Sequence, residues 1–172
     1  KLRIFSLFLL VQAWPLFAFS QSKSLASSAG WTVDAQSEAG ALRVLDRNQH
    51  LVRRYPLATL DGKYSAQGAE VFHTAARQSF VIAPIGLNEL WELSYRPDAD
   101  PIYDGYVHDY KMGEGIAKTG FLGLRRTPLD EPLQQLIFDE NHRHAIGATL
   151  ATATRAAELQ VINMDVRRRI ER

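Results

Sequence analysis

The sequence of 172 residues contains no cysteine. Disulfide bonds, thiolate zinc sites, cysteine nucleophiles and covalent attachment of a c-type haem are therefore excluded within this chain, because each needs a cysteine sulfur. A lipid anchor on an N-terminal cysteine is excluded for the same reason. Any metal or cofactor must be held by other side chains.

An excess of charge of either sign is missing too. Lys and Arg number 20 and Asp and Glu number 19, so the formal net charge is +1. This balance argues against a basic nucleic-acid-binding arm and against an acidic disordered tail. With 46% hydrophobic residues, the sequence indicates a mostly globular protein without a nucleic-acid partner.

The signatures of several enzyme classes are absent as well. The sequence has no Walker loop, no GxGxxG, no HExxH and no serine elbow. Amphipathic helical stripes are scarce, although residues 131–138 could form a short helix. The sequence therefore favours a fold made mainly of strands.

One long apolar run stands at the N-terminus. Residues 4–19 follow two basic residues and lead to small side chains before position 21. This order is typical of a secretory signal peptide, so we expect residues 1–20 to be cleaved after Ser20, leaving no stable membrane anchor. An uncleaved anchor helix is the alternative, which Pro15 disfavours because proline kinks a helix.

Short strand-like segments recur along the rest of the sequence. Residues 42–46 align with 159–163, and residues 52–54 align with 166–168, which indicates an internal repeat. A third copy of the strand-turn-strand unit lies between them. In order, the segments cover residues 31–33, 41–45, 51–55, 79–83, 89–95, 144–149, 159–163 and 166–170.

Antiparallel units of about 40 to 50 residues are typical of a β-propeller, in which each unit is one four-stranded blade. A β-sandwich is the alternative, but it does not require one unit to return repeatedly. We therefore predict an all-β fold in which residues 31–172 form part of a propeller, with about three to four blades present. Residues 21–30, rich in Ser and Ala, should be a flexible leader.

Residues 96–137 interrupt the repeat and are predicted to form a long insert loop rich in aromatic, charged and glycine residues. Loops of this length are usually functional or disordered. Within it, His108 is a candidate metal ligand or proton donor, because one imidazole nitrogen can coordinate while Asp109 orients the other. A histidine that only satisfies a local hydrogen bond is the alternative.

Further candidates lie outside the centre of this loop. His73 precedes a strand, where it could reach a cofactor over the mouth of a propeller. Arg125 and Arg126 could clamp the carboxylates of a ligand, or form a solvated pair. His142 and His144 would share one strand face, as in some zinc sites, but no third ligand accompanies them and a hairpin explains the segment more simply.

Several stretches together resemble a known family. Residues 78–81, 89–95 and 101–110, and the later part to 169, look like the haem d1-type propeller proteins. These are the cytochrome d1 domain of cytochrome cd1 nitrite reductase and its relatives in haem d1 biosynthesis, of the NirF and NirN kind. The resemblance covers roughly residues 31–172 and is strongest across the long loop.

The resemblance implies a periplasmic eight-bladed propeller that holds haem d1 or a precursor, in haem d1 biogenesis or nitrite respiration. Its partners would be the tetrapyrrole and periplasmic haem d1 biogenesis proteins or nitrite reductase. Ala75 stands where the family has its proximal histidine, with His73 two residues earlier. An enzyme of this kind would act as an oxidoreductase in haem d1 maturation rather than as a complete nitrite reductase. A non-enzymatic periplasmic scaffold for protein partners is the alternative.

Overall fold

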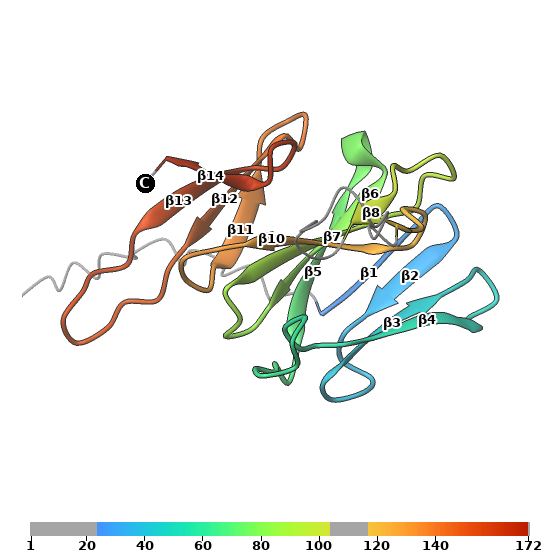
Figure 1. Ribbon diagram of the computed structural model, residues 1–172, viewed down its shortest axis with the longest axis horizontal. Coiled ribbons are helices and arrows are strands. Elements are labelled where there is room, and N and C mark those ends of the chain that lie inside the picture. Colours follow the sequence, from blue (N-terminus) through green and yellow to red (C-terminus); the bar gives the residue numbers. More distant parts are fainter. Residues whose placement is uncertain (1–23, 104–116, 172) are drawn as a thin grey trace, which may run out of the picture.

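The computed structural model of the chain describes residues 24–103 and 117–171 (Figure 1). Its strands form three four-stranded antiparallel sheets and one two-stranded sheet, which confirms the all-β prediction. In the part of the chain that is described, no helix has the length and apolar character needed to cross a membrane.

The first sheet pairs four strands in chain order: β1 (Leu25–Ser28), β2 (Trp31–Asp34), β3 (Ala41–Leu45) and β4 (Leu51–Pro56). The prediction of a flexible leader over 21–30 is wrong for β1. Ala29 and Gly30 join β1 to β2 with φ of 51° and 81°, the left-handed geometry of a two-residue hairpin turn. The Ser27 and Thr32 hydroxyls, 2.8 Å apart, add a hydrogen bond across the pair.

The second sheet contains β5 (Ala69–Thr74), β6 (Ser79–Pro84), β7 (Glu89–Ser94) and β10 (Leu124–Pro128). A 3-10 turn, η1 (Ala75–Arg77), joins β5 to β6. The small sheet of β8 (Ile102–Tyr103) and β9 (Ala117–Lys118) lies between β7 and β10 in the chain. The loop predicted over residues 96–137 therefore extends too far. Part of it, β10, is a strand that pairs with β7 and completes the second sheet.

The third sheet contains β11 (Gln134–Phe138), β12 (His144–Ala148), β13 (Leu159–Asn163) and β14 (Arg168–Glu171). The short helix suggested for 131–138 is wrong, since pairing with β12 draws this segment into a strand with Leu136 buried. The first aligned pair of the internal repeat is confirmed: segments 42–46 and 159–163 cover most of β3 and all of β13, the third strands of their sheets. The second pair is not equivalent, because 52–54 lie within β4 whereas 166–168 cover the turn before β14 and its first residue.

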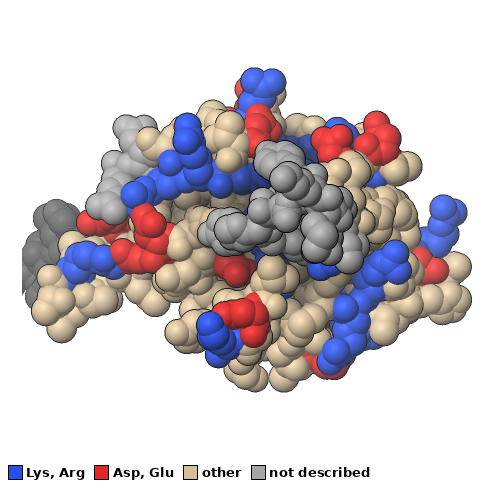
Figure 2. Space-filling model, in the orientation of Figure 1, with Lys and Arg blue, Asp and Glu red and all other residues tan. Residues whose placement is uncertain are grey.

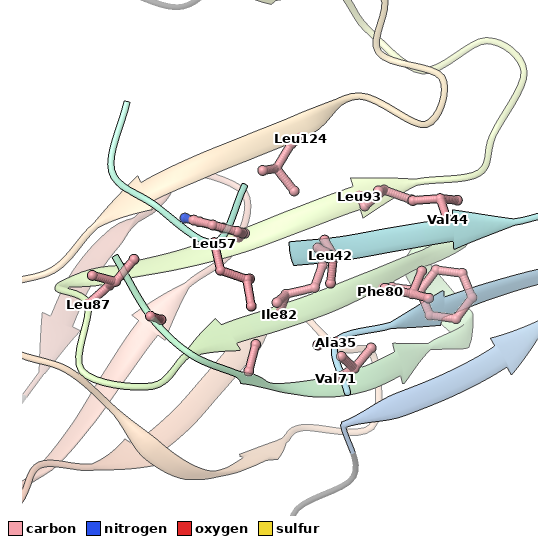
Figure 3. Close-up of a cluster of buried hydrophobic side chains, with 14 of the residues drawn as sticks. Ala35, Leu42, Val44, Leu57, Val71, Phe80, Ile82, Leu87, Leu93 and Leu124 are labelled. Carbon is pink, nitrogen blue, oxygen red and sulfur yellow. The ribbon is translucent and has the colours of Figure 1, made fainter. Parts of the chain in front are cut away.

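The three large sheets stack face to face, with the second in the middle (Figure 1). Side chains of β6 alternate between the two interfaces: Phe80 and Ile82 join the cluster shared with the first sheet, and Val81 and Ala83 join that shared with the third. Figure 3 shows the former cluster. All six residues of β6 are buried as a result.

The first strands of successive sheets are neighbours. β1 contacts β5, and the ring of Phe72 on β5 packs against that of Phe138 on β11 at 5.6 Å between centroids. Four-stranded antiparallel sheets that repeat around adjacent first strands have the arrangement of successive propeller blades. The described part of the chain thus contains three blades.

Candidate functional site

His73 lies near the end of β5, the first strand of the second blade, where the side chain is half-buried. Its Nε2 is 3.0 Å from the Tyr95 hydroxyl, and the two rings stack with centroids 6.0 Å apart. The Phe80 ring packs on it at 5.5 Å. Burial and, second, the nearby His142 lower the pKa of His73. Burial therefore favours the neutral imidazole, the form that coordinates metals.

His142 occupies the turn between β11 and β12 with φ of 53°. Its ring lies 5.8 Å from that of Phe138, and its Nδ1 is buried without a hydrogen-bond partner. A buried polar atom in this state is uncommon and costs free energy. His73 and His142 come from separate blades, and His142 lies close enough to His73 to lower its pKa.

His144 is engaged elsewhere. Its Nδ1 lies 2.8 Å from a carboxylate oxygen of Asp139, and its Nε2 lies 3.3 Å from the Asn163 amide. Backbone and side-chain hydrogen bonds from His144 lower the pKa of Asp139. This hairpin arrangement, formed by β11 and β12, agrees with the hairpin interpretation of the segment.

The candidate metal ligand His108 lies outside the described residues. Among residues 24–103 and 117–171, no group of three or more histidine, cysteine or acidic side chains is placed to hold a metal ion. The described part of the chain therefore places the imidazoles of His73 and His142 near one another but does not supply a complete set of metal ligands there.

Arg125 and Arg126 are separated by the pleat of β10, because adjacent residues of a strand point to opposite faces. Arg126 faces the first blade: it pairs with Glu89 at 2.7 Å, donates to the Ala58 carbonyl oxygen at 2.8 Å and lies 4.3 Å over the Trp91 ring. Arg125 faces the other way and donates to the Asp100 carbonyl oxygen at 2.9 Å. The structure does not bring the two guanidinium groups together.

A cavity of about 650 Å³ opens between the second and third blades on the side of Arg125. The second blade contributes η1, the end of β7, the segment after β7, and β10 to its walls. The third blade contributes the β11–β12 and β13–β14 turns. Five arginines and three acidic residues are among the described lining residues: Arg77, Arg96, Arg125, Arg143, Arg167, Glu92, Asp100 and Asp165. Small-molecule sites commonly enclose about 300 to 1,000 Å³.

Arg77 joins the two blades at the base of this cavity. It donates to both carboxylate oxygens of Glu92, at 2.8 and 3.3 Å, and to Asp165 at 2.6 Å. Glu92 also accepts from the Ser79 hydroxyl at 2.8 Å. Burial opposes the charge on Arg77, but the hydrogen bonds and charges of Glu92 and Asp165 outweigh it and raise the pKa of Arg77.

The basic side chains of this region continue onto the surface. Figure 2 shows a band of lysine and arginine atoms where β14 lies in Figure 1. Arg167 and Arg168 are exposed there. This end of the third blade is therefore positively charged beside the cavity.

Comparison with known proteins identifies the fold. No protein-family model matches the chain, and no curated protein matches its sequence significantly. A solved structure of the dihydro-heme d1 dehydrogenase NirN in complex with DHE is similar, with a TM-score of 0.58 and 24% sequence identity over 85% of this chain. The chain spans 26% of that protein's length. The match shows a propeller-like fold similar to that part of NirN.

Sequence reasoning missed Arg77, Glu92, Asp165 and the proximity of His142 to His73. Arg77 and Glu92 meet because β6 and β7 pair within the second blade. Asp165, 88 residues after Arg77, joins them only because the third blade packs against the second. One signal was present: Glu92 interrupts the apolar run of β7 at a position that faces a neighbouring blade. A buried acidic residue of this kind predicts a basic partner.

Proposed function

We propose that the chain is a haem d1-type propeller protein that binds haem d1 or a precursor, in haem d1 biogenesis or nitrite respiration. The observation that carries the proposal is the structural similarity to NirN over 85% of the chain. Whole-protein activity is part of the proposal, since the chain spans 26% of that protein. An oxidoreductase role in haem d1 maturation is its enzymatic form.

The histidines near the first strands fit a tetrapyrrole in part. Burial favours the neutral form of His73, and the Nδ1 atom of His142 is buried without a partner. A neutral imidazole can coordinate a metal, and an unpartnered imidazole nitrogen can bond to a ligand. We propose His108 as a candidate metal ligand from the sequence alone. A bound haem would supply a redox-active iron centre.

Absorption spectroscopy tests the proposal. The refolded chain is mixed with haem d1, and the Soret and long-wavelength bands are compared with those of the free haem. We expect shifted bands for the unmodified chain and a changed spectrum for His108→Ala and His73→Gln. His50→Ala is the matched control, because the His50 side chain is 76% exposed and pairs only with Asp46 in the described structure. Bands identical to those of free haem d1 would refute haem binding.

The proposal includes export to the periplasm, where haem d1 biogenesis proteins or nitrite reductase would be the partners. The support is the signal-like order of residues 1–20. Expression of the chain with a C-terminal tag, followed by cell fractionation and N-terminal sequencing, tests this. We expect a periplasmic product that begins at Gln21. A cytoplasmic product that retains residue 1 would contradict it.

A further inference from the structure

The charges that line the cavity between the second and third blades do not cancel in pairs. Arg77 uses the carboxylates of Glu92 and Asp165. Arg96 pairs with Asp98, which lies outside the lining, at 3.3 Å. Two of the three acidic residues of the cavity, Glu92 and Asp165, thus pair with Arg77. They do not form ion pairs with the other described arginines that line the cavity.

Three lining arginines have no carboxylate partner among the described residues: Arg125, Arg143 and Arg167. Arg125 is held in place by its bond to the Asp100 carbonyl, while its Nε atom is buried without an acceptor. Like charges gathered around one cavity repel each other, and a buried donor without an acceptor costs free energy. An anion in the cavity would relieve the repulsion between these charges.

The two walls contribute differently to this cluster. Arg125 comes from β10 of the second blade, whereas Arg143 and Arg167 come from the β11–β12 and β13–β14 turns of the third. An anion that contacts all three must therefore present oxygen atoms to both walls. Guanidinium groups bind carboxylate and phosphate oxygens through paired N–H donors. A ligand with two or more such groups suits this geometry better than a single carboxylate.

We propose that this cavity is a binding site for a small multivalent oxyanion, one that carries at least two carboxylate or phosphate groups. Arg125 binds it from the second blade, and Arg143 and Arg167 bind it from the third. The described lining contains no histidine, and neither His73 nor His142 belongs to it. The site is thus separate from the histidine pair and does not depend on haem binding.

Binding should tie the two blades together. A ligand that contacts both walls stabilises the folded chain over the unfolded one by mass action. Citrate and pyrophosphate are the probes for the carboxylate and phosphate forms, and acetate at equal ionic strength is the monovalent comparison. Calorimetric titration and thermal unfolding of the full 172-residue chain, without added haem, measure affinity and stabilisation. We expect saturable binding and a raised Tm for citrate or pyrophosphate, and neither for acetate.

Variants locate the site. Arg143→Gln with Arg167→Gln should weaken binding about tenfold or more, because charged hydrogen bonds of this strength are lost. Arg125→Gln should weaken it from the opposite wall. Arg168→Gln is the matched control, since Arg168 is an exposed neighbour of Arg167 that does not line the cavity.

Asp100→Asn gives a test of the opposite sign. Asp100 lines the cavity without a described ion pair, so its neutralisation should strengthen anion binding. Equal stabilisation by acetate, citrate and pyrophosphate would show general ionic screening and overturn the proposal. Binding that survives in both the Arg143→Gln/Arg167→Gln and Arg125→Gln variants would also overturn it. A preference for citrate or for pyrophosphate identifies which oxyanion the site takes.

Discussion

The two interfaces between neighbouring blades are built differently. The first and second blades share one large apolar cluster that contains Trp91 and Phe80, and the Tyr55 hydroxyl donates to the Leu122 carbonyl oxygen across it at 2.5 Å. The cluster between the second and third blades is smaller. Beyond it lie the Arg77 network and the arginine-lined cavity.

The difference between the two interfaces indicates that folding stability and ligand binding depend on different interfaces. Burial of apolar surface stabilises by about 25 cal/mol per Å², whereas a polar cavity adds little apolar burial and leaves charges to be compensated. The middle blade serves both purposes because β6 and β7 direct alternate side chains to opposite faces. We therefore expect the first interface to hold most of the folding free energy and the second to hold the ligand-responsive part.

Truncation of Phe80 should have the largest effect. The ring is fully buried in the first interface, so Phe80→Ala should lower the free energy of unfolding by about 3–5 kcal/mol. Chemical denaturation monitored by tryptophan fluorescence measures it. Leu159→Ala is the control, because Leu159 is 64% exposed and should change stability by less than about 0.5 kcal/mol. Equal losses in the two variants would contradict the comparison.

Removal of Arg77 probes the polar part of the second interface. Arg77→Met leaves the Glu92 carboxylate, whose side chain is 9% exposed, without its basic partner. The expected loss is about 3 kcal/mol, because an uncompensated charge stays buried. In the double variant Arg77→Met/Glu92→Leu the charge is gone, so the loss should be smaller than for Arg77→Met alone. A double variant less stable than the single one would show that the unpaired Glu92 carboxylate is not the cause of the loss.

Gly147 probes the apolar part of the same interface. A methyl group at this position would lie 2.6 Å from Leu136 Cδ2 and 3.1 Å from Leu133 Cβ, so Gly147→Ala must shift these two leucines, which belong to the apolar cluster of this interface. We expect a loss of about 1–2 kcal/mol from overpacking, measured by denaturation. Gly68→Ala has no contact closer than 3.8 Å and serves as the control. A Gly147→Ala protein as stable as the control would indicate a looser interface.

The sequence was sufficient for the strands that carry a clear pattern. The β3 and β13 segments are apolar and similar, and they were correctly predicted as equivalent strands. β1 was missed because Leu25–Ser28 has no apolar alternation and its Ala29-Gly30 turn lacks the usual Asn or Asp. β10 and β11 were placed in a loop because their strand character comes from partners far away in the chain.

The sequence allowed individual residues of the site to be predicted, but not how they are grouped in space. Sequence reasoning selected His73 and Arg125, and the structure places both at the same end of the second blade, one facing Tyr95 and the other lining the cavity. It could not pair Arg125 with Arg143 and Arg167, since this grouping arises from packing of the second blade against the third. A pattern within one strand carries no information about the residue that faces it across an interface.

The pH dependence of folding should show the smallest effect. Burial, and then the proximity of His142, lower the pKa of His73 below its ordinary value of 6.5. The unfolded chain then takes up a proton at a higher pH than the folded one, so the stability that this group contributes is complete above pH 6.5 and is lost as the pH falls from there toward the folded pKa. In His73→Gln this contribution is absent. Thermal unfolding at pH 7.5 and 5.5, chosen as about one unit either side of that ordinary value, should therefore show a smaller decrease in Tm for His73→Gln than for the unmodified chain. An equal decrease would mean that His73 is protonated as readily in the folded chain as in water.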